Sequence, residues 1–592
     1  FVVPAIDFQL ARIEIERGRV TEGLAMLRDI KPQMSGLLRP KLGAVLGWEA
    51  EALLRLGRPN EAIPLARESV AELTQYRDLD SLWYAQWREG KALAGAGDRP
   101  AALAAFNAAV TTVTALRRFP MGYRLESTFF ADKLPLFDDA IFLAADLGDA
   151  PTAARLIEQV KSRALTSMLT VASVAGQKSG DLDAAVDDLS RRVDVLEYAA
   201  YQSGWTGETV AVRDRLLTER TRLLERILVS DPRWRTLSRP AEPDLNEIAA
   251  SLERANQAAL SLYYRSGRVV TLLIYRGRAQ IAVKSLSEST VAAISAYQEN
   301  LSSATSDHGK LDPSAWPDLA ADRLVPVELL SQALGADGLV VVPHGPLHLL
   351  PWSALTLDGT RLFERCAVGV LPNMSCLKIL EPAPAGPPSI ALLGAPTYLG
   401  TSGLSELPLA AEELFTVAEI FGDRVVGAPR IGAEATQDAY RELLADPKGT
   451  HGILHLACHG DLVAGDPENS GLLLHDGKLD ASEIARRKIP FDEVVLSACA
   501  SGYRPTRVGS VELSADDIVG LPGAFLEAGA RSVLVSIPPA RDDAALAFMT
   551  LYYEHRVLGE PPLRSFREAE MAMLAAGDYP AHLWAGFTFY GR

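Results

Sequence analysis

The chain of 592 residues has few cysteines, no long apolar run and no extended basic cluster. Its four cysteines, at positions 366, 376, 458 and 499, are too few and too irregularly spaced for a disulfide framework, which favours a reducing compartment. No window approaches the roughly 18 uninterrupted apolar residues that a membrane-spanning helix needs. The longest Lys/Arg cluster is Arg486–Lys488 and the net charge is −16, which argues against direct binding to nucleic acid or anionic lipid. We therefore expect a cytoplasmic globular protein without a membrane segment.

The length and the first residue bear on the organisation of the chain. A chain of 592 residues exceeds what one hydrophobic core can support, so we expect about two to four domains. The chain begins with Phe1 rather than Met, which indicates a fragment. A removed leader and further amino-terminal repeats both stay open.

Glycine-centred turns recur in the amino-terminal third, at Gly18, Gly57, Gly97 and Gly148. Each is followed, five and six residues later, by a small and then usually an apolar residue, which is typical of a helix that packs closely on its neighbour. This pattern resembles tetratricopeptide repeats and predicts helix pairs over residues 1–170. A plain, alanine-rich α-helical domain is the alternative. Stacked helix pairs form a concave surface, so we expect an activating or inhibitory protein partner there.

The rest of the chain divides into a connector and a sheet domain. Residues 171–245 combine leucines at three- and four-residue spacing with interleaved charges, which predicts a helical hairpin or connector. Residues 246–592 alternate short apolar runs with helical patterns, which predicts a doubly wound, mainly parallel α/β sheet. The expected strands cover residues 269–275, 280–283, 338–343, 389–393, 453–456, 494–497 and 532–536.

Two of these expected strands end next to reactive side chains. His459 follows the run at 453–456, and Cys499 follows the run at 494–497. In open α/β sheets the chemistry lies beyond the carboxyl ends of the strands, so a thiol nucleophile and its general base would meet there. A free thiol ionises near pH 8.5 and an imidazole near about 6.5, so His459 is suited to take the thiol proton. Backbone N–H groups of Gly460 and Cys499 are candidates for the oxyanion site. The alternative for Cys499 is a buried small hydrophobe.

A metal site is the competing interpretation of His455, Cys458 and His459. Their spacing would gather them on one face of a helix, whereas on a strand Cys458 points away from both histidines. We therefore expect no metal and no cofactor, and we expect Cys458 to pack in the core. No third residue that would orient His459 is identifiable.

Seven motifs carry a family resemblance, because they recur in the expected order. They lie at residues 343–355, 407–413, 455–460, 470–474, 496–499, 520–530 and 584–587. In this order they resemble the CHAT domain, a group of caspase- and separase-like peptidases usually found behind tetratricopeptide repeats. The resemblance covers roughly residues 245–592. It implies a caspase-like sheet domain in which His459 and Cys499 cleave peptide bonds.

The resemblance also suggests residues for a substrate pocket. Asp542 stands where separase-like members carry an acidic pocket residue, which would select Arg or Lys before the cut. Residues 537–541 replace the usual tryptophan-containing turn. An equal alternative makes Asp542 a helix N-cap. Asp543 and Asp461 are further pocket candidates.

The sequence therefore predicts a regulated cysteine endopeptidase that cuts a protein substrate. The resemblance places it in a prokaryotic immune or programmed-death pathway, where family members cleave gasdermins or partners of CRISPR effectors. The alternative is a catalytically silent scaffold that binds a partner protein, and a metal-dependent hydrolase is a third class.

Overall fold

The computed structural model describes most of the chain in two compact units. The described ranges are residues 2–34, 41–116, 132–161, 244–306, 319–380, 386–395, 407–446, 451–461, 470–498 and 520–592, with shorter pieces between them. Chain contacts place Val160 at the end of the first unit and Lys161 at the start of the second. The expected connector, residues 171–245, lies largely outside the described residues.

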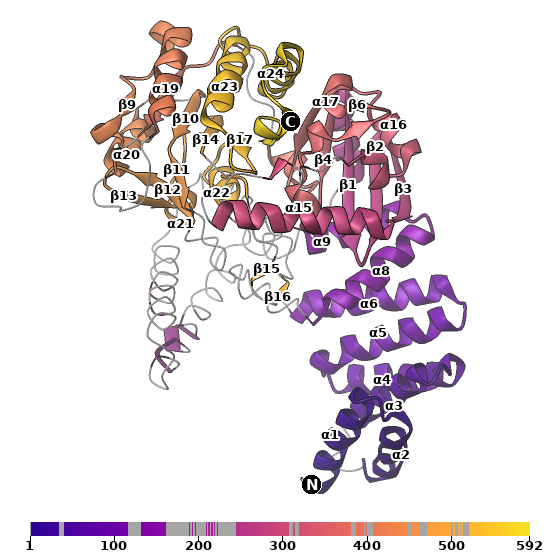
Figure 1. The fold of residues 1–592 in the computed structure, drawn as a ribbon. Helices are drawn as coiled ribbons and strands as arrows, with labels where there is room; N and C mark the ends of the chain where they lie inside the picture. The colour runs from indigo at the N-terminus through magenta and orange to yellow at the C-terminus, as the bar shows by residue number, and fades with distance from the viewer. Residues whose placement is uncertain are drawn as a thin grey trace. The chain divides into compact units, whose positions relative to one another are not determined.

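The first unit is entirely helical over its described residues, as the sequence predicts. Figure 1 shows its helices stacked as neighbours, in indigo and violet. The α-helices are α1 (Val2–Glu16), α2 (Val20–Ile30), α3 (Leu42–Arg55), α4 (Pro59–Gln75), α5 (Leu79–Gly95), α6 (Arg99–Leu116), α8 (Leu134–Asp146) and α9 (Ala150–Val160).

The four glycine turns separate the two helices of each pair. Gly18, Gly57, Gly97 and Gly148 have φ angles of 86°, 71°, 90° and 73°, a left-handed conformation that favours glycine. The small residues that follow these turns are buried, so each second helix can approach its neighbour closely. The glycines recur because each turn needs this left-handed backbone conformation.

The second unit is built on a sheet of 11 strands in the order β3-β2-β1-β4-β7-β18-β17-β14-β10-β8-β9. Seven of its ten strand pairs are parallel, and the antiparallel pairs are β1–β2, β2–β3 and β17–β18. The strands are β1 (Gln257–Arg265), β2 (Arg268–Tyr275), β3 (Arg278–Ser285), β4 (Gly338–Val342), β7 (Ala367–Val370), β8 (Ile390–Gly394), β9 (Arg430–Ile431), β10 (Ile453–Ala457), β14 (Glu493–Ser497), β17 (Ser532–Ser536) and β18 (Phe587–Tyr590).

Smaller strands and helices surround this sheet. The strands are β5 (Thr356–Leu357), β6 (Thr360–Arg361), β11 (His459–Asp461), β12 (Gly471–Leu474), β13 (Gly477–Asp480), β15 (Arg507–Val508) and β16 (Val511–Glu512). The α-helices are α14 (Leu245–Arg254), α15 (Glu288–Ser306), α16 (Val327–Ala333), α17 (Leu362–Arg365), α18 (Cys376–Ile379), α19 (Pro408–Phe421), α20 (Gln437–Ala445), α21 (Ala481–Ala485), α22 (Leu521–Glu527), α23 (Asp542–Arg556) and α24 (Pro562–Ala576). None of the described helices combines the length and apolar character needed to cross a bilayer.

The main core of this unit lies between the sheet and three helices. Helices α19, α23 and α24 pack side by side over the strands from β7 to β8 (Figure 1). Aromatic side chains fill the space, with Phe548 stacked on Phe587 at a ring-centroid distance of 4.6 Å. Burial of large aromatic surfaces dominates the stability of such a core.

A buried ion pair crosses this core. The guanidinium of Arg556 on α23 donates from Nε and Nη2 to Oε2 of Glu493 on β14, at 3.0 and 2.8 Å. The hydroxyl of Tyr552 donates to Oε1 of the same carboxylate at 2.5 Å. Glu493 is 1% exposed and Arg556 4% exposed. Both carboxylate oxygens are thus satisfied, as a buried charge requires.

A second buried carboxyl gives the fold a pH dependence. Burial raises the pKa of Glu570 on α24 to about 8, against the lowering effect of Arg361 and Arg567. The unfolded carboxyl ionises near about 4.3, so between these pH values unfolding releases a proton and the free energy of unfolding falls by up to ~1.4 kcal/mol per pH unit. Glu570→Gln removes this ionisation and should raise the melting temperature progressively relative to the parent as pH rises toward 8.

The measurement is the difference in melting temperature between variant and parent, taken from about pH 6 to about pH 9. Glu568→Gln, on the same helix but partly exposed, is the control and should show no such trend. A constant difference for Glu570→Gln across this range would contradict the assignment.

Candidate active site

Strands β10 and β14 bring the two segments that precede the predicted dyad together. They are adjacent and parallel, and Ala457 pairs in register with Ser497. His459 and Cys499 each stand two residues beyond this pair. Neighbouring strands are about 4.8 Å apart, so the two chain segments leave the sheet side by side. Cys499 itself lies outside the described residues.

His459 begins a small sheet and is held by Tyr398. It pairs with Leu473 of β12 in the β11–β12 ladder. Its backbone N–H donates to the hydroxyl of Tyr398 at 3.1 Å, and the two rings have centroids 5.3 Å apart. The chain segment that presents the imidazole is therefore fixed from two sides, which is what a positioned general base requires.

A buried polar network lies beneath the site and joins both strands to two helices. Nε2 of His455 on β10 lies 2.9 Å from Oε1 of Glu413 on α19. Nδ1 of His455 is 2.8 Å from the hydroxyl of Tyr553 on α23, and the hydroxyl of Ser497 on β14 donates to Oε2 of Glu413 at 3.1 Å. His455 is 0% exposed and Glu413 3% exposed. Such a network, in a region of low polarity, resists displacement of either strand end.

Cys458 lies between His455 and His459 in the sequence. Its buried side chain lines the pocket that His459 also lines. It is 1% exposed, and burial raises the pKa of its thiol to about 12. A thiol with so high a pKa is a poor nucleophile at neutral pH. The partners of His455 are a carboxylate and a phenol, and among the described residues no cluster of His, Cys, Asp or Glu is arranged to hold a metal ion.

A small pocket of about 30 Å³ lies beside His459. Ala498, the residue before Cys499, also lines it, as do Glu413 and Asp542. Asp542 is half-buried, and this burial raises the pKa of its carboxyl, while His459 lowers the pKa and Glu413 and Asp543 raise it further. The pocket therefore presents carboxylates next to the segment that carries the predicted nucleophile.

The structure settles one alternative for Asp542. The residue in the N-cap position of α23 is Arg541, whose side chain makes no capping hydrogen bond, and Asp542 lies in the first turn. The prediction that Asp542 is an N-cap is therefore wrong, because the helix begins one residue earlier than that role needs. Its position in the first turn still places a negative charge near the positive end of the helix.

The other predicted pocket residues lie elsewhere. Asp543 binds Arg541 at 2.5 Å, and Asp461 on β11 binds Lys478 at 3.0 Å; neither lines the pocket with Asp542. Gly460 lies in β11 opposite Leu472. Its role as an oxyanion donor stays a prediction.

Sequence reasoning assigned no role to Tyr398 or Glu413. Glu413 is part of one of the seven motifs, but its acidic character alone gave no reason to place it under β10. The available signal was a glutamate on the same side of α19 as Leu414 and Val417, which are buried. Tyr398 follows a strand-end turn, where nothing in the sequence indicates a contact with His459.

Parts of the chain are similar to known proteins. A family model described as the CHAT domain matches residues 311–592. Tetratricopeptide repeat protein 28 from Homo sapiens is 24% identical over 298 residues, which is 43% of this chain but only 12% of that protein. The Mus musculus protein of the same name is 25% identical over 306 residues, with the same coverage of 43% and 12%.

One solved structure aligns with nearly the whole chain. The Saccharomyces cerevisiae separase–securin complex matches 99% of this chain and 53% of that chain, at 12% identity and a TM-score of 0.39. Strands β1 to β3 precede residue 311 yet belong to the same sheet, since β1 pairs with β4. The chain therefore carries a CHAT domain behind an amino-terminal region of tetratricopeptide-like helix pairs.

Proposed function

We propose that this chain is a cysteine endopeptidase in which His459 and Cys499 form the catalytic dyad. The observation that carries the proposal is the register of β10 and β14, because the segments that lead to His459 and Cys499 continue from paired positions of neighbouring strands. The pocket beside His459 and Ala498 supports it, because it places the carboxylate of Asp542 next to the segment that leads to Cys499.

The proposed reaction follows from the two groups. His459 takes the proton of the Cys499 thiol, and the thiolate sulfur attacks the substrate carbonyl carbon. His459 then gives its proton to the leaving amine as the peptide C–N bond breaks, which leaves a thioester. Water, deprotonated by the same imidazole, hydrolyses the thioester and restores the thiol.

A covalent trap tests this proposal directly. The full chain is incubated with a peptidyl acyloxymethyl ketone bearing Arg, which alkylates an activated thiolate, and its intact mass is measured. We expect one adduct, located at Cys499 by peptide mapping and absent in His459→Ala. A chain that forms no adduct and cleaves no member of a peptide library would support the silent scaffold instead.

Asp542 gives the proposal a specificity. A half-buried carboxylate favours Arg or Lys before the cut, and loss of one partner of a charge pair enclosed by the bound substrate costs about thirtyfold or more. We expect Asp542→Asn to lower kcat/KM for substrates with Arg or Lys by that factor, measured on matched fluorogenic peptides. Asp543→Asn is the control and should change it less than about threefold, because Asp543 is paired on the surface. Retention of the basic preference in Asp542→Asn would contradict this role.

The helical unit supports a regulated peptidase, since stacked helix pairs are suited to hold a protein. The cytoplasmic location and the place in a prokaryotic immune or programmed-death pathway stay predictions, which rest on composition and on family resemblance.

A further inference from the structure

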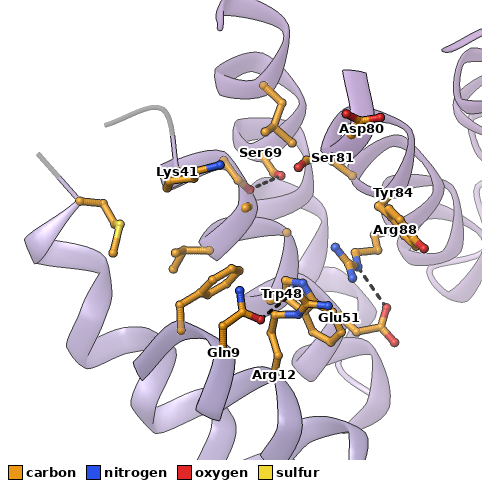
Figure 2. A pocket seen from close by; sticks show the side chains of 18 of the residues that line it. Gln9, Arg12, Lys41, Trp48, Glu51, Ser69, Asp80, Ser81, Tyr84 and Arg88 are labelled. Carbon is orange, nitrogen blue, oxygen red and sulfur yellow. Dashed lines mark hydrogen bonds and ion pairs between the residues drawn. The ribbon is translucent and has the colours of Figure 1, made fainter. Parts of the chain in front are cut away.

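The helical unit contains a pocket of about 530 Å³. It is lined from α1, α3, α4 and α5, and Figure 2 shows side chains of these helices converging on it. Its volume lies within the range of about 300–1,000 Å³ that ligand sites have. Part of its wall is apolar, through Phe8, Met34 and Leu73, and another part is charged.

The charges of the lining favour an anion. Five cationic side chains line the pocket, against three carboxylates, in a chain whose net charge is −16. The cations are Arg12, Lys41, Arg55, Arg88 and Lys91, and the carboxylates are Glu16, Glu51 and Asp80. Glu16 and Asp80 are exposed, at the end of α1 and the start of α5. The positive excess is therefore local and opposes the charge of the whole chain.

Glu51, the buried carboxylate, is already engaged. It accepts from Arg55 at 2.9 Å, from Lys91 at 3.0 Å and from Arg88 at 3.4 Å. Burial raises the pKa of this carboxyl, but Lys91, Arg88 and Arg55 outweigh that effect and lower it to about 2. One carboxylate shared among three cations leaves positive charge that it does not balance.

Two guanidinium groups lie against one indole at the centre of the pocket. The guanidinium carbon of Arg12 is 4.8 Å from the ring centroid of Trp48, and that of Arg88 is 4.5 Å from it. Arg88 is 7% exposed. Burial lowers the pKa of Arg88 and Arg12 lowers it further, although Glu51 raises it. Two like charges held this closely repel each other, and an anion between them would relieve that repulsion.

Arg12 has unused hydrogen-bonding capacity. Its Nη1 donates to the side chain of Gln9 at 3.1 Å, while its Nε is buried without a hydrogen-bond partner. Over the described residues, no carboxylate lies within ion-pair distance of Arg12. A buried donor without a partner is costly, and a ligand oxygen would satisfy it.

The backbone of α3 is shaped to admit Arg88. A Cβ atom on Gly47 would lie 3.2 Å from Nη1 of Arg88 and 3.0 Å from Oγ of Ser69. The absence of a side chain at Gly47 thus lets the guanidinium lie close to the helix. The guanidinium of Arg88 therefore occupies space that the packing of the helices leaves open for it.

We propose that this pocket binds an acidic peptide segment of a partner protein, with an Asp or Glu carboxylate received by Arg12 and Arg88 beside Trp48. Carboxylates match the planar donor fork of arginine, and the apolar wall suits neighbouring side chains of a peptide. The pocket lies within the helical unit, and none of its residues belongs to the peptidase site. Peptide binding at the pocket can therefore be tested independently of the proposed dyad.

The test is fluorescence polarisation with the full chain and two peptide pools. Each pool holds labelled nonapeptides with three fixed positions, Asp or Glu in one pool and Asn or Gln in the other, among randomised residues. We expect the acidic pool to bind at least about tenfold more tightly, and added salt to weaken that binding. Arg12→Gln should weaken binding of the acidic pool about tenfold, because it removes one charge-assisted contact.

Arg67→Gln is the matched control, since Arg67 lies on α4 outside the pocket lining and pairs with Glu89 on the surface. It should bind the acidic pool as the parent does, and the circular dichroism melts of both variants should match the parent. Equal binding of the two pools, unchanged binding by Arg12→Gln, or no binding of the acidic pool up to about 1 mM would overturn the proposal.

Discussion

Replacing Cys499 by alanine is expected to lower peptide cleavage at least about a thousandfold. The thiol is the only group in the proposed mechanism that forms a bond to the substrate, so its loss removes the covalent route altogether. Variants that lose one member of a nucleophile and base pair show losses of this order or larger, because the remaining member cannot act alone. His459→Ala should give a loss of about 100-fold to 10,000-fold, since it leaves the thiol but removes its base.

The measurement is kcat/KM on a peptide selected from a library, with the full chain at neutral pH. Cys366→Ala is the matched control for Cys499→Ala, because Cys366 is 2% exposed and burial raises its pKa to about 12. His451→Gln is the control for His459→Ala, because His451 lies on the surface beside Asp492. Cleavage that persists in Cys499→Ala would refute the dyad, whatever the controls show.

Arg556→Met is expected to destabilise the sheet unit by about 3–5 kcal/mol. The substitution removes the guanidinium from Glu493, a carboxylate that is 1% exposed, and leaves it buried with Tyr552 as its remaining partner. An uncompensated buried charge has a cost of this size, whereas the intact pair itself contributes less. Because Glu493 begins β14, the loss of stability should be largest in β14, the strand that precedes Cys499 in the sequence.

Hydrogen exchange followed by mass spectrometry measures the stability of the sheet unit separately from that of the helical unit. A single unfolding curve of the whole chain would not separate the two. Peptides from β14 and α23 should exchange faster in Arg556→Met, while peptides from α3 to α6 keep their rates. Arg564→Met is the control: Arg564 is 66% exposed and 3.9 Å from Glu560, so a change within about 0.5 kcal/mol is expected. Unaltered exchange in β14 would show that Glu493 tolerates the loss.

The general architecture could be predicted from the sequence because its patterns are local. All seven expected strands are present in the sheet, and the five of them that have parallel partners are short, largely apolar runs. Strands β1, β7, β9 and β18 were not predicted, and β9 has only two residues. Strand β1 mixes alanine with polar residues, and β7 and β18 have four residues each, too short for a pattern to stand out.

The site could be predicted only in part, because its remaining contacts are long-range. His459 stands out as a histidine at the end of an apolar run. The contacts of Glu413 with His455 and Ser497 join residues 42 and 84 positions apart, and no local pattern shows them. Asp542 could be placed near the pocket by resemblance, but only the start of α23 excluded its role as an N-cap.

The order of contacts among the helix pairs has a mechanical consequence. Along the described helices each helix packs on the next in the chain, as α3 on α4, α4 on α5 and α5 on α6, so that neighbouring pairs are also in contact. A unit built this way responds to tension stepwise, because a terminal pair can peel away while the others stay folded. The 530 Å³ pocket receives side chains from α1, α3 and α5, which belong to three successive pairs. Any molecule bound there would act as a crosslink across those pairs, and it would raise the force needed to separate them.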